Sequence, residues 1–124
     1  ASDVYKRQGG KGEKLRFYVL ILANELKPFL EYQKKVIERE FPYSLEKAGC
    51  EIERLTIGEK YMELVFLIPV RADIKQALDK VINECNQYGN FLSQVFTITN
   101  VKELSAEEVE EIIKKNGGNS QASH

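Results

Sequence analysis

Residues 50–69 read CEIERLTIGEKYMELVFLIP, and the predicted fold depends most on these residues. Two segments rich in β-branched and apolar residues, 50–57 and 61–69, flank the short turn Gly58-Glu59-Lys60, whose length suits a hairpin. One face of the second segment is entirely apolar: Met62, Leu64, Phe66, Ile68 and Val70. The other face is mixed: Tyr61, Glu63, Val65 and Leu67. We therefore predict a hairpin with one face under helices and the other partly open or against a partner.

Two more strands and one irregularity complete the predicted sheet. Residues 15–23 are almost continuously apolar, which is typical of a central strand buried on both faces. Residues 94–100 form the fourth predicted strand. Within 50–57 the apolar alternation changes phase between Ile52 and Leu55, which predicts a β-bulge near Arg54.

The first predicted helix follows the strand at 15–23. Asn24 offers an N-cap for it, and Pro28 falls in or just past its first turn, where a missing N–H costs little. Pro42 is expected to kink or restart the helix, and Gly49 to end it.

Two further helices have clearer start signals. Asp73 and Gln76 are placed as a capping box, and Gly89 closes that helix. Its apolar positions share one face: Ile74, Ala77, Leu78, Val81, Ile82, Cys85 and Tyr88. A second capping box, Ser105 to Glu108, opens a last helix that is predicted to run to about Lys115.

The order of these elements is β-α-β-β-α-β-α. Right-handed crossovers over one sheet then give an α+β fold, a ferredoxin-like β-α-β-β-α-β sandwich with a four-stranded antiparallel sheet plus a C-terminal helix. We expect a disordered leader at 1–14, a single domain at 15–115 and a disordered tail at 116–124. Residues 3–8, DVYKRQ, resemble a translated sequencing adaptor, so 1–8 are interpreted as a scar in a metagenomic assembly.

Composition restricts the class of protein. The chain has 124 residues, 43% hydrophobic and 30% charged, which suits one globular domain. No apolar run reaches membrane-spanning length, and two cysteines without a secretory signal predict reduced thiols in a cytoplasmic protein. The formal net charge of −1 argues against strong non-specific binding to nucleic acid.

Several chemistries lack their residues. The only histidine is His124, the terminal residue, which excludes catalytic triads and histidine metal sites. Cys85 is interpreted as a core residue, and Cys50 has no histidine to activate it. Glu51, Glu53, Glu59 and Glu63 surround the hairpin; they are interpreted as a solvated face, and a carboxylate–metal site there is the only enzyme form left open. We expect no cofactor and lean against an enzyme.

The pattern of elements resembles the single-tyrosine HUH transposases of small insertion sequences. The stretches that carry the resemblance are the apolar first strand, Ala48-Gly49, the strand starting at Cys50, residues 61–69 leading to Asp73, 96–100 and 105–113. The family would place a metal-binding histidine pair where Tyr61 and Glu63 stand, and a nucleophilic tyrosine near Ile112. The resemblance therefore implies the fold without the DNA-nicking chemistry.

Three functions remain open from the sequence. The first is a non-catalytic interaction module, a homo-oligomer formed through its sheet, by the mixed face or an edge strand. The second is a nucleic-acid-binding, catalytically inactive relative of those transposases, and the third is a small-ligand regulatory domain. Candidate contacts to nucleic acid or a partner are Arg54, Lys60, Tyr61, Glu63 and Arg71, which combine cations with an aromatic ring that can stack on a base.

Overall fold

The structure is a computed structural model that describes residues 13–100 and 102–122. The interpreted scar, most of the predicted leader and His124 lie outside the described residues. The elements in order are β1 (Lys14–Ala23), the short 3₁₀ turn η2 (Asn24–Leu26), α2 (Glu31–Lys47), β2 (Glu51–Ile57), β3 (Tyr61–Pro69), α3 (Ile74–Asn86), β4 (Leu92–Thr99) and α4 (Ala106–Ala122).

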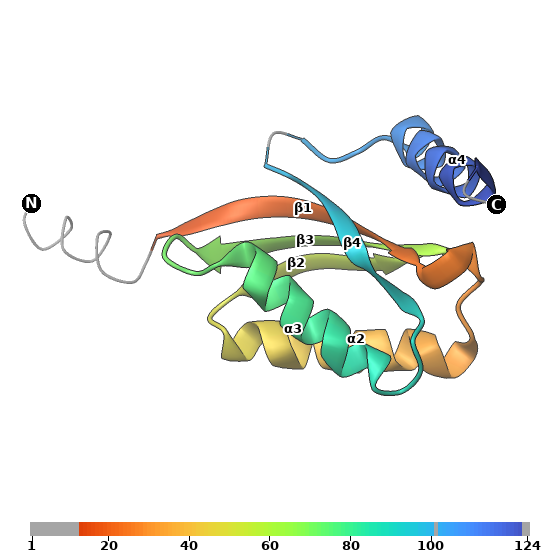
Figure 1. Ribbon diagram of the computed structural model, residues 1–124. Coiled ribbons are helices and arrows are strands. Elements are labelled where there is room, and N and C mark those ends of the chain that lie inside the picture. Colours follow the sequence, from red (N-terminus) through yellow and green to blue (C-terminus); the bar gives the residue numbers. More distant parts are fainter. Residues whose placement is uncertain (1–12, 101, 123–124) are drawn as a thin grey trace, which may run out of the picture.

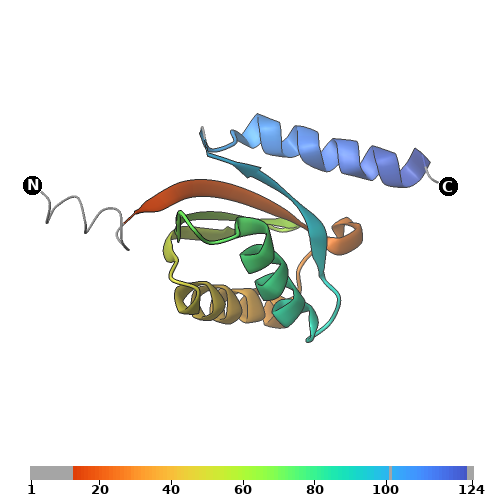
Figure 2. The same cartoon turned by 60° about the vertical axis from the view of Figure 1, so that its left-hand side comes forward.

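The four strands form one antiparallel sheet in the order β2-β3-β1-β4, the ferredoxin-like arrangement predicted from the sequence. Helices α2 and α3 lie on one face of the sheet, and α4 crosses the other face (Figure 1, Figure 2). The molecule therefore has a helical layer, a sheet and a single helix on top of it.

The main core lies between the sheet and the α2–α3 layer. Of the apolar face predicted for β3, Met62, Leu64, Phe66 and Ile68 are buried there, whereas Val70 lies past the end of the strand and is exposed. Helices α2 and α3 contribute fully buried side chains: Ile37, Phe41, Leu45, Leu78, Val81 and Ile82. The apolar face predicted for α3 packs on this core from Ile74 to Cys85, whereas Tyr88 lies past the end of the helix and is exposed. Asp73 caps that helix as expected, because its Oδ1 accepts a hydrogen bond of 3.2 Å from the Gln76 N–H.

The hairpin has the predicted bulge. Ile52 pairs with Phe66 and Arg54 pairs with Val65, so Glu53 is the extra residue on β2. Beyond the bulge, Arg54 and Thr56 lie on the same face of the sheet as Glu63 and Tyr61. The bulge thus sets which side chains of β2 point toward α4.

The prediction for the start of the first helix was wrong. Asn24 begins the 3₁₀ turn and caps no helix; its side chain donates to the Asn90 carbonyl, at 3.1 Å, instead. The helix starts only at Glu31. Proline disfavours helical backbone at the residue before it, and Lys27, which precedes Pro28, is accordingly extended. The helix then continues through Pro42 without restarting.

Helix α2 ends, and helix α4 begins, at the residues that the sequence predicted. Gly49, at φ +89°, ends α2 in a Schellman motif: the N–H of Cys50 donates to the Leu45 carbonyl and that of Gly49 to Glu46. The predicted capping box opens α4, with reciprocal hydrogen bonds of 2.8 and 3.2 Å between Ser105 and Glu108. The helix runs to Ala122, past the predicted end at Lys115.

Candidate nucleic-acid interface

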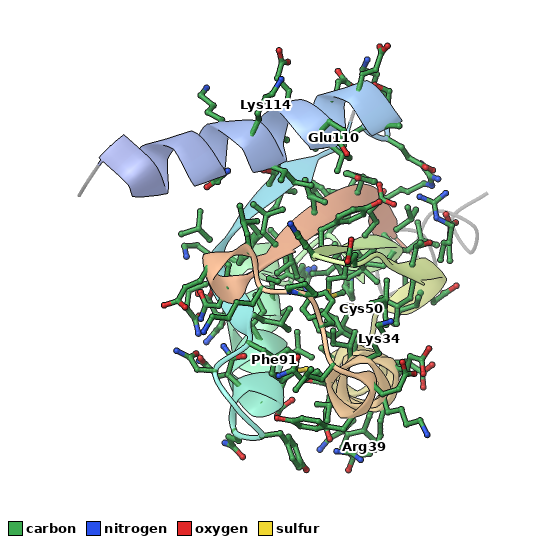
Figure 3. The ribbon with its side chains drawn as sticks, turned by 90° about the vertical axis from the view of Figure 1, so that its right-hand side faces the viewer. Lys34, Arg39, Cys50, Phe91, Glu110 and Lys114 are labelled. Carbon is green, nitrogen blue, oxygen red and sulfur yellow. The ribbon has the colours of Figure 1, made fainter. Side chains whose placement is uncertain are left out.

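An open groove lies between the β2–β3 hairpin and the start of α4. It has a volume of about 500 Å³ and is lined by Arg54, Thr56, Tyr61, Glu63, Leu104, Ala106, Val109 and Glu110; we call it the α4 groove. Figure 3 shows α4 above the sheet, with the labelled Glu110 on this helix and Cys50 on the opposite side of the sheet. The groove exists because α4 rests on the mixed face of β3.

The structure brings three of the five candidate contacts together. Arg54, Tyr61 and Glu63 all line the α4 groove. Lys60 lies beside it in the β2–β3 turn, where its backbone carbonyl accepts from the Ala23 N–H at 2.8 Å. Arg71 follows Pro69 at the opposite end of β3 and takes no part in the groove.

Tyr18 holds the carboxylate of Glu63 from the neighbouring strand. The Tyr18 side chain comes from β1, is 2% exposed, and its hydroxyl donates to Glu63 Oε2 at 2.5 Å. Burial, and then the hydrogen bond to Glu63, raise the pKa of Tyr18 well above its usual range. The hydroxyl therefore stays protonated at neutral pH and remains a donor to Glu63.

Tyr18 was not among the predicted site residues. It was interpreted only as part of a buried apolar strand. The available signal was its register, since Tyr18 pairs with Val65 and Leu20 with Glu63, which puts Tyr18 diagonally next to Glu63 on one face. That register could not be read without knowing that β1 lies beside β3.

Tyr61 packs on the backbone of the hairpin turn. A Cβ added at Gly58 would come within 2.7 to 3.0 Å of the distal ring atoms of Tyr61, so the ring lies directly against Gly58. The Gly58 N–H also donates to the Tyr61 carbonyl at 2.8 Å, which closes the turn. The absence of a side chain at position 58 therefore places the half-buried ring of Tyr61 at the edge of the groove.

Arg54 is held by an ion-pair network at one end of the groove. Glu103, in the segment before α4, contacts Arg54 at 2.8 Å and Arg16 at 3.1 Å, and Arg16 also contacts Glu53 at 2.8 Å. The hydrogen bonds from Arg54 and Arg16 lower the pKa of the Glu103 carboxyl. These exposed contacts tie β1, β2 and the approach to α4 together, and they neutralise much of the charge of Arg54.

The groove is consequently acidic. Two carboxylates line it, Glu63 from β3 and Glu110 from α4, against a single arginine that already contacts Glu103. A phosphate would be repelled here, whereas a group that donates hydrogen bonds would be attracted.

The mixed sheet face, which is predicted to be partly open or against a partner, is covered in its apolar part by α4. Tyr18, Leu20, Leu22, Val65 and Val109 form a second buried cluster between the sheet and α4, and Tyr61 packs against its edge. Val65 is only 1% exposed. Self-association through this part of the face would require α4 to move.

Neither cysteine contributes to the groove. Cys50 and Cys85 are free and belong to the core on the α2–α3 side of the sheet. Burial raises the pKa of both thiols, that of Cys85 to about 12. In the part of the chain that the structure describes, no three His, Cys, Asp or Glu side chains are grouped closely enough to hold a metal ion.

Across residues 13–100 and 102–122, none of the helices is both long and apolar enough to cross a bilayer.

Comparison with known proteins gives a likeness of fold. No family model matches the sequence, and no curated protein matches it significantly. A putative transposase from Deinococcus radiodurans R1 has a similar structure, with a TM-score of 0.68 at 13% identity over 86% of this chain and 93% of that one. A REP-associated tyrosine transposase, solved bound to a REP hairpin, has a TM-score of 0.58 at 13% identity over 82% of this chain.

The second neighbour is the longer protein, and this chain spans 62% of its length. At 13% identity these matches establish the fold and leave the chemistry to the residues themselves. The resemblance to single-tyrosine HUH transposases that the sequence pattern indicated is thereby confirmed as a likeness of fold.

Proposed function

We propose that this protein binds nucleic acid that carries an unpaired base, as a hairpin or a single strand, and does not cut it. The observation that carries the proposal is the α4 groove, which gathers Arg54, Tyr61 and Glu63 in a fold shared with transposases. One of those neighbours was solved with a hairpin bound. A tyrosine beside hydrogen-bonding side chains is a common way to hold an unpaired base.

The absence of cleavage is proposed from the residues that line the groove. Tyr61 and Glu63 stand where the resemblance would place two metal-binding histidines. On α4 the groove-lining residues are Ala106, Val109 and Glu110, and none of these is a tyrosine nucleophile. Ile112 packs at the edge of the apolar cluster beside the groove.

The acidity of the groove shapes the binding that we expect. With few free cations near the site, contacts to phosphate should be few, so the affinity should be micromolar and should depend weakly on salt. The slope of log affinity against log salt concentration should not exceed about 1.5 in magnitude, which corresponds to roughly two phosphate contacts. Lys60, next to the groove, is the best placed candidate for one of them.

Fluorescence anisotropy with labelled DNA and RNA hairpins, single strands and blunt duplexes tests the proposal. We expect hairpins and single strands to bind more tightly than a blunt duplex, and Tyr61→Ala to weaken binding by about tenfold, as loss of a base–aromatic contact does. Tyr43→Ala is the matched control, because Tyr43 is exposed on α2 on the far side of the sheet.

The same variants distinguish the candidate cations. Lys60→Ala should weaken binding several-fold, while Arg71→Ala, at the other end of β3, should leave it unchanged. Equal affinity for all nucleic acids, insensitive to Tyr61→Ala, would contradict the proposal. So would strand cleavage in the presence of Mg²⁺ or Mn²⁺.

Within this proposal the protein acts in the cytoplasm, where buried thiols such as Cys50 and Cys85 stay reduced. Self-association and regulation by a small ligand stay predictions from the sequence.

A further inference from the structure

The floor of the α4 groove presents one carboxylate in a fixed position. Glu63 Oε2 already accepts the hydrogen bond of the buried Tyr18 hydroxyl. No donor in residues 13–100 and 102–116 contacts Oε1, the other oxygen of the same carboxylate. Since each carboxylate oxygen has two lone pairs, Glu63 can still accept two adjacent hydrogen bonds from a ligand in the groove.

The surroundings of Glu63 favour a nucleobase over a phosphate. Glu110 adds a second negative charge to the groove, and Arg54 is engaged by Glu103 at 2.8 Å. The ring of Tyr61 lies at the edge of the groove, held against Gly58, where it can contact the face of a base. A flat ligand with hydrogen-bond donors along one edge therefore fits this site.

Resting on the proposed function, we infer that the α4 groove holds one unpaired base and selects guanine. Guanine offers two adjacent donors on its Watson–Crick edge, N1–H and the N2 amino group, and a carboxylate accepts such a pair side by side. Adenine and cytosine each place an acceptor nitrogen next to their single amino group, and that nitrogen would face the carboxylate. Thymine and uracil carry one N–H between two carbonyl oxygens, so the same repulsion applies.

Tyr18 acts as a positioning residue in this inference. Its hydroxyl fixes the rotation of the Glu63 carboxylate from the neighbouring strand β1, while its ring is buried in the apolar cluster between the sheet and α4. Without that hydrogen bond the carboxylate can turn away or meet water. The selectivity for guanine should then fall even where the groove and its aromatic edge persist.

Competition binding with one DNA hairpin that carries a single unpaired nucleotide tests the inference. The unpaired base is guanine, hypoxanthine, adenine, cytosine or thymine, and everything else is kept constant. Hypoxanthine is the sharpest comparison, because it keeps N1–H and lacks only the N2 amino group. We expect guanine to bind about 5- to 20-fold more tightly than hypoxanthine, and the other bases to be weaker still.

Two variants locate the selectivity. Glu63→Gln replaces one acceptor by a donor that opposes the guanine amino group, so the guanine to hypoxanthine ratio should fall to about one. Tyr18→Phe should lower the ratio as well, while Glu59→Gln, an exposed carboxylate in the adjacent turn, should preserve it. Circular dichroism and the thermal midpoint identify any variant that has lost its fold. The ratio of guanine to hypoxanthine affinity is measured on the unmodified protein, so it tests the inference even if a variant does not fold.

The outcomes separate this inference from the proposed function. Binding that is indifferent to the unpaired base overturns the guanine pocket and leaves nucleic-acid binding intact. Guanine selectivity that survives Glu63→Gln overturns it too. Failure to bind any of the five hairpins, at low salt and high protein concentration, overturns both.

Discussion

Helix α4 should be the least firmly held element of the fold. The variant Val109→Ala measures how much the burial of this side chain contributes to the free energy that holds α4 on the sheet. Among the α4 side chains that the structure describes, only Val109 is buried, at 4% exposure, and Ile112 and Ile113 are half-buried beside it. Truncation to alanine removes two methyl groups, worth about 1.6 kcal/mol of burial at about 0.8 kcal/mol each. The open groove beside α4 lets the helix shift, so the cavity penalty should be small and the total about 1–2 kcal/mol.

This loss should appear as local opening of α4. Native-state hydrogen exchange reads it directly: α4 amides should exchange roughly 5- to 30-fold faster in Val109→Ala, while amides of β1 and β3 should keep their protection. Lys114→Ala, at an exposed position on the same helix, is the matched control and should change neither set.

Two results would refute this reasoning. Equal acceleration of α4, β1 and β3 amides would mean that α4 unfolds only with the whole domain. Unchanged α4 exchange would mean that Val109 does not hold the helix. Because the groove needs a docked α4, Val109→Ala should also weaken hairpin binding.

Three further predictions concern stability. Gly49→Ala should destabilise the protein by about 1–2 kcal/mol in urea unfolding, since Gly49 has φ +89° and a new Cβ would lie 3.2 Å from Pro69 Cγ; an unchanged unfolding midpoint would contradict this. Asp73→Ala should cost about 1 kcal/mol through loss of the α3 cap, and Asp73→Asn should restore most of it; equal losses would contradict the capping role. Burial raises the pKa of the Cys85 thiol from its ordinary value to about 12. The contribution of Cys85 to the free energy of unfolding is therefore complete below about pH 9 and falls by about 1.4 kcal/mol per pH unit up to about pH 12. Cys85→Ala should make this fall of stability with pH less steep, and an equally steep fall in the variant would exclude Cys85 as its cause.

Local chemistry made much of the fold predictable. The hairpin and its bulge could be predicted because the alternation of apolar and polar residues shows directly which side chains share a face of a strand. The capping residues Asp73 and Ser105 could be predicted because each accepts its hydrogen bond from a backbone N–H only three residues later in the sequence. The start of α2 was not, because two local signals compete there: Asn24 favours a cap, and Pro28 forces the preceding backbone to be extended.

The site was predictable only in part. Tyr61, Glu63 and Arg54 could be grouped from the hairpin alone, since they lie on neighbouring strands. Tyr18 and Glu110 come from β1 and α4, and their proximity depends on strand order and on which face α4 covers. Periodicity shows that a face is apolar without identifying the element that covers it, and so the sequence predicts the mixed face only as partly open or against a partner.

The most direct test of the central claim is an NMR titration of the ¹⁵N-labelled protein with a DNA hairpin that carries one unpaired guanine. We predict that the largest amide shift changes fall on Arg54, Tyr61, Glu63 and Glu110, around the α4 groove, and that the exposed faces of α2 and α3 remain unchanged. Shift changes confined to α2 and α3, or none at saturating hairpin, would contradict the assignment of this groove as the nucleic-acid interface.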